Sequence, residues 1–323
     1  MIPKEIIGHV TDLAQLSEDI NAGNVVHAYL FSGPRHLGKF TVAQWFSRKL
    51  LTAGVGDEMA KERMYDQIDR LIHPDYFQLD QLWIEDVCED PAVIGCTTNI
   101  PQKHRQEVKA KTNEIGIEDI RALHERLYEI GTGQYRCCVI RSAERMREAA
   151  GNALLKILEE PPKGVVFILT SEFPSLLLPT LHSRMRQLRF TRLSQDALKP
   201  LVKGMPPDDA QFLLHLAQGT PGIVVRLRAD PDALRKERTV FTQASEFWHS
   251  QSLIARLQLL KPLHERSEEA EAFLLHLALA LQAEEGNKQI HSTALHRLIR
   301  GLKTNAQRKL LAQQFAMTVM EVR

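Results

Sequence analysis

Features that would point to a membrane protein or a strongly basic nucleic-acid binder are scarce in this chain of 323 residues. No apolar run approaches the ~20 residues that a membrane-spanning helix needs. The opening MIPKEIIGHV lacks the apolar core of a signal peptide. The net charge is only +1, so any contact with DNA must come from local patches or from partners. We therefore expect a cytoplasmic globular protein with no membrane contact.

Cysteine is also scarce, with four residues in the chain. Cys137 and Cys138 fall in a predicted buried strand, whereas Cys88 and Cys96 lie in a polar stretch. This spacing does not indicate a disulfide framework. A closed zinc site needs four ligands, and Cys88 and Cys96 do not supply them even with His104. We expect neither zinc nor another metal to be bound.

The most informative pattern runs from residue 151 to residue 190. Apolar residues recur at helical spacing over 153–158, and the pair Pro161–Pro162 ends this predicted helix. The run Val165–Leu169 has no polar residue and is typical of a central strand in a parallel sheet with both faces covered. Glu159 and Glu160, at the helix end, are interpreted as solvated, because adjacent helix residues do not face each other.

The segment 33–41 nearly matches the phosphate-loop pattern G-x-x-x-x-G-K-[ST], with Gly33, Gly38 and Lys39 in place. In such a loop, backbone N–H groups surround phosphates, the lysine reaches the terminal phosphates, and the next hydroxyl binds Mg²⁺. Phe40 stands where that hydroxyl belongs. Thr41 follows one residue later, rotated by about 100° around a helix, so it does not replace the hydroxyl. The alternative is a tight glycine turn that binds no nucleotide.

Three motifs, Asn152–Lys156, Leu158–Pro162 and Leu178–Arg184, resemble in this order the signature of bacterial clamp-loader subunits, which are AAA+ proteins of the DNA polymerase III holoenzyme. The segments Ile6–His9 and His27–Phe31 carry the same resemblance. The resemblance implies an α/β AAA+ core with a parallel sheet of the P-loop type, followed by an all-α lid and an all-α collar domain.

The resemblance also predicts domain boundaries. We expect a core over 1–191 with an insertion at about 83–113, a helical lid over 192–235, and a helical collar for oligomerisation over 236–323. The basic residues of the insertion would touch DNA phosphates or a partner, or form a solvated loop. The family often carries a cysteine-bound zinc module before a His-Pro-Asp turn; here Leu51–Ile72 contains no cysteine, so that zinc site is predicted absent.

A second departure from the family pattern follows the predicted strand 136–140. An ATP-hydrolysing member has acidic residues there, which hold the Mg²⁺ shell and polarise water. Arg141 and Ser142 occupy these positions, and Glu144 comes two residues late. Together with Phe40, these changes remove the same Mg²⁺ chemistry. We predict a subunit that does not hydrolyse ATP, with at most residual, Mg²⁺-free binding of ATP or ADP at Gly33, Gly38, Lys39 and Thr41.

In the family, a Ser-Arg pair such as Ser183-Arg184 provides an arginine finger to the ATP site of the neighbouring subunit. The resemblance therefore implies a delta-prime type subunit that supplies Arg184 in trans. Its partners would be ATPase subunits and the clamp-opening subunit of a hetero-oligomeric ring, with the sliding clamp and primed DNA reached through the complex. From composition alone, Arg184 belongs to a solvated basic turn with Arg186 and Arg189.

Two other functions remain open. The first is an ATP-hydrolysing gamma/tau-type subunit, which would need a carboxylate such as Glu144. The second is an AAA+-like adaptor outside the replisome, which only its partners would distinguish.

Overall fold

The computed structural model describes residues 6–79, 98–100, 114–129, 131–283 and 288–321. It separates into two compact units. Unit 1 contains Met1–Pro200 and Gln218–Gly222, and unit 2 contains Leu201–Ala217 and Ile223–Arg323. The predicted boundaries at 191 and 235 stay predictions, and most of the predicted insertion at 83–113 lies outside the described residues. No helix in the described part of the chain is long and apolar enough to cross a membrane.

A five-stranded sheet organises unit 1, with the strand order β2-β3-β4-β1-β5 and parallel pairing throughout. Its strands are β1 (Ala28–Ser32), β2 (Tyr76–Leu79), β3 (Arg136–Ile140), β4 (Val165–Ser171) and β5 (Arg186–Arg189). The predicted parallel sheet is confirmed, and the predicted central strand is longer by two residues at its C-terminal end. Since parallel strands end at one edge, the loops after β1, β3 and β4 are brought together there.

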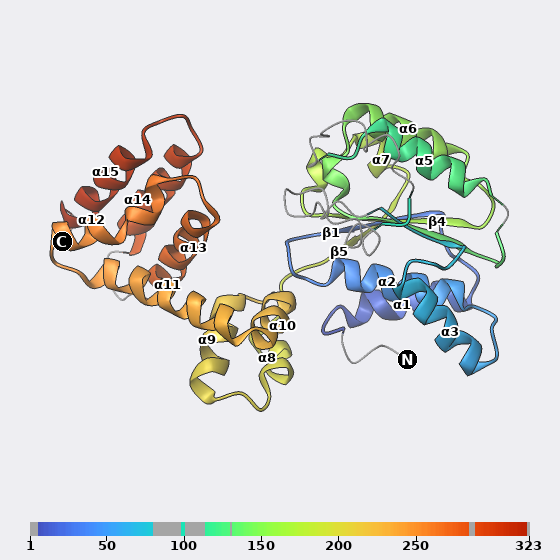
Figure 1. Ribbon diagram of the computed structural model, residues 1–323, viewed down its shortest axis with the longest axis horizontal. Helices are drawn as coiled ribbons and strands as arrows, with labels where there is room; N and C mark the ends of the chain where they lie inside the picture. The colour runs from blue at the N-terminus through green and yellow to red at the C-terminus, as the bar shows by residue number, and fades with distance from the viewer. Residues whose placement is uncertain (1–5, 80–97, 101–113, 130, 284–287, 322–323) are drawn as a thin grey trace. The chain divides into compact units, whose positions relative to one another are not determined.

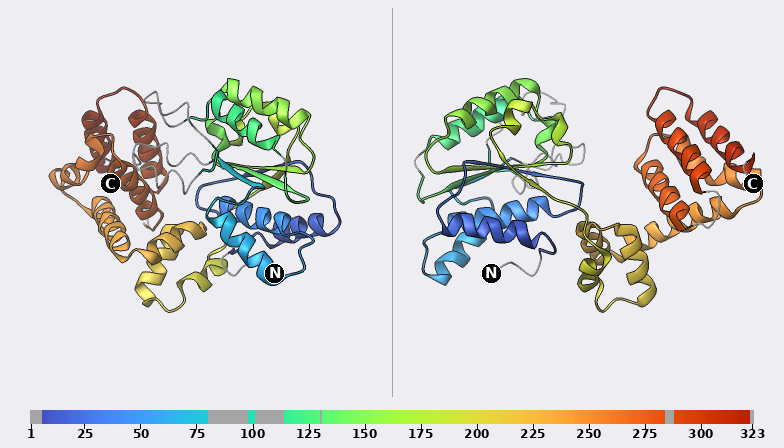
Figure 2. Two further views of the ribbon diagram at one scale, coloured as in Figure 1. Left: turned by 45° about the vertical axis from the view of Figure 1, so that its right-hand side comes forward. Right: turned by 180° about the vertical axis from the view of Figure 1, so that it is seen from behind.

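Helices cover both faces of this sheet, as Figure 1 and the rear view in Figure 2 show. One face carries α1 (Val10–Asn21), α2 (Lys39–Leu51) and α3 (Glu58–Asp69); the other carries α5 (Ile117–Leu127), α6 (Glu148–Glu159) and α7 (Pro179–His182). Alternate residues of β4 enter the two cores. Val166 and Ile168 pack in the α2 core, whereas Val165, Phe167 and Leu169 pack in the α6 core. Because both faces of β4 are buried, every residue of the run is apolar. Burying each of these side chains contributes about 1.5–3 kcal/mol to the free energy of folding.

A buried ion pair holds the His-Pro-Asp turn to the start of β3. Asp75 is 1% exposed and Arg136 is 6% exposed, and Arg136 Nε lies 3.3 Å from Asp75 Oδ1. The Asp75 carboxylate also accepts hydrogen bonds from the backbone N–H groups of Thr132 and Gly133. Arg136 donates to the carbonyl oxygens of Arg126 and Leu127 at the end of α5 and to that of Glu129 just beyond it. The pair therefore fixes β2, β3 and α5 together.

Short elements connect the rest of unit 1: η3 (Ala143–Arg145), η4 (Pro174–Leu176), α8 (Gln195–Leu198) and η5 (Lys199–Val202), which runs on into unit 2. Ser194 caps α8, because its hydroxyl accepts from Ala197 N–H at 3.3 Å.

Unit 2 is helical. Its helices are α9 (Pro207–Ala217), α10 (Pro221–Ala229, which begins in unit 1), α11 (Pro231–His249), α12 (Leu253–Leu259), η6 (Lys261–His264), α13 (Glu268–Ala283), α14 (Lys288–Leu302) and α15 (Arg308–Glu321). Helices α11 to α15 share one apolar core. Helix α11 begins at Pro231, because Asp230 accepts from two backbone N–H groups and proline suits the first helical position.

Candidate functional site

The loop between β1 and α2 has the backbone of a phosphate loop. Gly33 has φ of 141°, and a Cβ there would lie 2.3 Å from the carbonyl oxygen of Phe190. Gly38 has φ of 82° and precedes the first residue of α2. Both positions therefore favour glycine, Gly33 because of its φ and the lack of space for a Cβ, and Gly38 because of its φ. The first N–H groups of α2 point out of its N-terminus and favour an anion there.

Lys39 lies under this loop and is 8% exposed. Its Nζ donates to the carbonyl oxygens of Gly33 and Pro34, both at 2.6 Å. Burial lowers the pKa of Lys39, and the nearby carboxylates of Glu172 and Glu144 partly oppose this shift. The lysine thus has backbone partners within its own loop.

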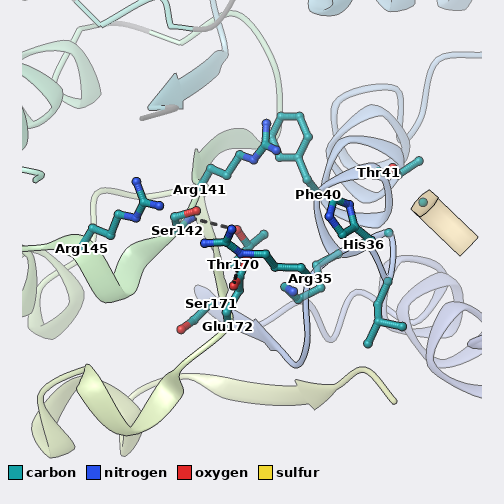
Figure 3. Close-up of a pocket in the computed structure, with 14 residues that line it drawn as sticks. Arg35, His36, Phe40, Thr41, Arg141, Ser142, Arg145, Thr170, Ser171 and Glu172 are labelled. Atoms are coloured by element: carbon teal, nitrogen blue, oxygen red, sulfur yellow. Dashed lines mark hydrogen bonds and ion pairs between the residues drawn. The ribbon is translucent and has the colours of Figure 1, made fainter. Parts of the chain in front are cut away.

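A cavity of about 360 Å³ lies in front of the loop at the sheet edge (Figure 3). Its lining residues come from the loop, the start of α2 and the ends of β3 and β4; they include Gly38, Lys39, Phe40, Thr41, Arg141, Ser142, Arg145, Thr170 and Glu172. Arg35 also lines the cavity and forms an ion pair with Glu172 at 2.7 Å. Cationic side chains outnumber carboxylates in this lining, so the cavity suits an anion.

Phe40 and Arg141, the two departures from the family pattern, contact each other inside this cavity. The guanidinium carbon of Arg141 lies 4.8 Å from the centre of the Phe40 ring, and Figure 3 shows the arginine reaching to that ring. A cation over an aromatic face is attracted by about 0.5–1 kcal/mol or more. The place where a hydroxyl and a carboxylate would hold Mg²⁺ thus contains a phenyl ring and a positive charge. These residues do not fit a magnesium ion.

The other residues predicted near the metal do not repair this site. Ser142 donates its backbone N–H to the Thr170 hydroxyl at 3.2 Å. Glu144 accepts from the backbone N–H of Glu172 at 3.3 Å and is not among the described residues that line the cavity. Thr41 lines the cavity, but its side chain points away from Arg141 in Figure 3. Among the described residues we find no cluster of three or more potential metal ligands; Cys88, Cys96 and His104 lie outside them.

Arg184 lies outside the described lining of the cavity, in the turn that follows α7. Its Nη1 donates to the Thr180 carbonyl at 3.0 Å and to the Ser183 hydroxyl at 3.5 Å. Its Nη2 donates to Glu159 Oε1 at 2.8 Å. Ser183 in turn donates to the same Thr180 carbonyl. Glu159 is exposed at the end of α6, which confirms its interpretation as a solvated helix end, and the chain turns back to bring Arg184 to it.

The arginines of this basic segment differ in their surroundings. Arg186 forms an ion pair with Asp19 of α1 at 2.6 Å, which ties β5 to that helix. Arg189 is exposed at the end of β5. The side chain of Arg184 is 36% exposed and is held at the surface by Glu159. Composition alone placed these three arginines in one solvated basic turn, whereas in the structure their partners and exposure differ.

The geometry and the motifs agree with a comparison to protein families. A family model described as DNA polymerase III, delta subunit, matches residues 8–194. The chain belongs to this family. The clamp-loader resemblance read from the sequence is thereby confirmed, as is the AAA+ fold class with its parallel sheet and helical C-terminal part.

The similar curated proteins include two kinds of DNA polymerase III subunit, gamma/tau and delta′. A DNA polymerase III subunit gamma/tau from Mycobacterium bovis is 29% identical over 222 residues, which is 67% of this chain and 34% of the relative. DNA polymerase III subunits delta′ from Bacillus subtilis and Pseudomonas aeruginosa are 26% and 28% identical, over 70% and 66% of this chain and 61% and 58% of their own lengths. The chain thus spans about a third of the gamma/tau relative and about three fifths of the delta′ relatives.

Among solved structures, a gamma-subunit-related protein from Thermotoga maritima is 18% identical, with a TM-score of 0.47 over 96% of this chain and 98% of its own.

Proposed function

We propose that this chain is a non-hydrolysing subunit of a replicative clamp loader in the cytoplasm. It would help to load the sliding clamp onto primed DNA by assembling in a hetero-oligomeric ring with ATPase subunits and a clamp-opening subunit. The contact between Arg141 and Phe40 carries the proposal. A site that places a cation and a phenyl ring in the metal position lacks the means to hold Mg²⁺ and to polarise water, on which phosphoryl transfer depends.

The active contribution of the chain would be Arg184, supplied to the ATP site of a neighbouring subunit. This role is supported by the position of Arg184 outside the chain's own cavity, by its exposure, and by its anchoring through Ser183 and Thr180. A guanidinium that reaches a triphosphate stabilises the charge that spreads over the transferring phosphoryl group. Ser183 would orient Arg184 without contacting the nucleotide.

The loop itself would bind phosphate groups without a metal. We propose that ADP or ATP occupies it through Gly33, Gly38 and Lys39, with Arg141 supplying positive charge beside the loop. The cationic lining of the cavity favours this form of binding. No zinc or magnesium takes part.

A gamma/tau-type subunit that hydrolyses ATP is the second candidate, because the chain also resembles gamma/tau proteins. It would require Glu144 to act as the missing carboxylate, but Glu144 binds a backbone N–H group beside the cavity. An adaptor outside the replisome is distinguished by its partners: it would not assemble with the ATPase subunits.

The test is ATP turnover by a reconstituted loader with clamp and primed DNA. The loader would contain wild-type chain, Arg184→Ala, or the matched control Arg189→Ala, and the isolated chain serves as the blank. Arginine fingers contribute on the order of 10³–10⁵ in rate at the site they serve, so we expect Arg184→Ala to lower turnover at that site by more than about tenfold. Turnover by the isolated chain would favour the gamma/tau candidate, and an unaffected Arg184→Ala assembly would refute the finger.

A further inference from the structure

An ion pair in unit 1 joins Arg184 to Glu159, which are 25 residues apart in the chain. Glu159 is the last residue of α6, and Arg184 follows α7. The two elements are packed closely. A Cβ on Gly151 of α6 would lie 3.0 Å from Leu178 Cδ1, and Leu181 is 1% exposed against the same helix. The backbone that carries Arg184 is therefore seated on α6, and Glu159 meets the far end of its side chain.

The contacts of Arg184 occupy some of the N–H donors of its guanidinium and leave others accessible. A guanidinium has five N–H donors. Nη1 donates to Thr180 and to Ser183, and Nη2 donates to Glu159. Nε and the second hydrogen of Nη2 have no acceptor among the described residues. Two N–H donors suffice for paired hydrogen bonds to a phosphate group.

We infer that Glu159 is a positioning residue, which fixes the direction of Arg184 before a neighbouring triphosphate arrives. The inference rests on the proposed role of Arg184 as a finger. An arginine side chain loses rotamer freedom when it is fixed on a ligand, and a partner that orders it beforehand removes part of that loss. Because the pair is exposed, the carboxylate favours the held orientation by a factor on the order of two to five.

The adjacent residue provides a matched control. Glu160 is exposed at the same helix end and is not among the hydrogen-bond partners of Arg184 in the described part of the chain, which are Thr180, Ser183 and Glu159. Its carboxylate gives the helix end the same formal charge, so Glu160→Gln changes the net charge of the chain as Glu159→Gln does. Only Glu159→Gln removes the charged partner of the Arg184 guanidinium.

The experiment is a double-mutant cycle in the complete loader with clamp and primed DNA. The variants are Glu159→Gln, Arg184→Ala, the double variant and Glu160→Gln, and kcat and KM for ATP are measured for each. We expect Glu159→Gln to lower kcat about two- to fivefold with KM unchanged, because positioning acts in the transition state. It should have no further effect in the Arg184→Ala background, whereas Glu160→Gln should match wild type.

The outcomes separate this inference from the proposed function. If Arg184→Ala leaves turnover unchanged, the finger is refuted, and the positioning role is refuted with it. If Arg184→Ala lowers turnover but Glu159→Gln has no effect, only the positioning role is refuted. The same conclusion follows if Glu159→Gln lowers turnover equally in both backgrounds, because the effect then does not pass through Arg184.

Discussion

We predict that the contact between Phe40 and Arg141 makes the proposed binding of nucleotide by this chain independent of Mg²⁺. A divalent ion in the place of the Phe40 ring would lie 4.8 Å from the guanidinium carbon of Arg141. At an effective dielectric constant of about 20, that repulsion amounts to about 7 kcal/mol. A phosphate group is instead attracted to Arg141, and hydrogen bonds to charged groups contribute about 1.5–3 kcal/mol. Arg141→Ala should therefore weaken ADP binding by about 10- to 150-fold.

The assay is equilibrium binding of ADP to the isolated chain, with Mg²⁺ and with EDTA. Wild-type protein should bind no more tightly with Mg²⁺ than with EDTA. Arg121→Ala serves as the control, because Arg121 is an exposed residue of α5 paired with Glu118 and lies outside the described cavity lining. Tighter binding in Mg²⁺ would refute the reasoning about Arg141. Absence of ADP binding under both conditions would refute the nucleotide proposal and leave the role of Arg184 untouched.

Two further predictions concern stability. Arg136→Met leaves Asp75 buried without its cation, so the free energy of unfolding in urea should fall by about 3–5 kcal/mol, whereas Arg121→Met, at an exposed pair, should cost less than about 1 kcal/mol. His73 Nδ1 accepts from Asp75 N–H, and burial lowers its pKa below 6.5. Because the unfolded chain then binds more protons, stability should fall as the pH drops from 6.5 through that lowered pKa.

A specific result would contradict each stability prediction. Equal losses for Arg136→Met and Arg121→Met would show that burial of the first pair does not decide its contribution. For the pH dependence, His73→Asn keeps an acceptor for Asp75 N–H but does not titrate, so part of the loss below pH 6.5 should disappear in urea unfolding curves. The share due to His9, whose pKa burial also lowers, should persist. An unchanged curve for His73→Asn would contradict the assignment.

Local patterns in the sequence were sufficient for the elements and for the defect at the metal position. The apolar run Val165–Leu169 predicted a strand covered on both faces, and Pro161–Pro162 predicted where α6 ends. The spacing of Gly33, Gly38 and Lys39 predicted the loop, and Phe40 predicted that its hydroxyl ligand is missing. Such features depend on the period of a helix or strand and on the backbone demands of single residues, which neighbouring residues already determine.

Tertiary structure alone decided which charged groups meet. The strand order places the end of β3 beside that of β4, and β4 beside β1, which brings Arg141 to Phe40. The packing of α7 on α6 brings Arg184 to Glu159, a residue whose sequence context indicated only a solvated helix end. Contacts of this kind join segments far apart in the chain, and sequence periodicity carries no information on strand order or on how two helices pack. The sequence therefore determined the elements and the missing metal ligand, and the fold determined the partners of each arginine.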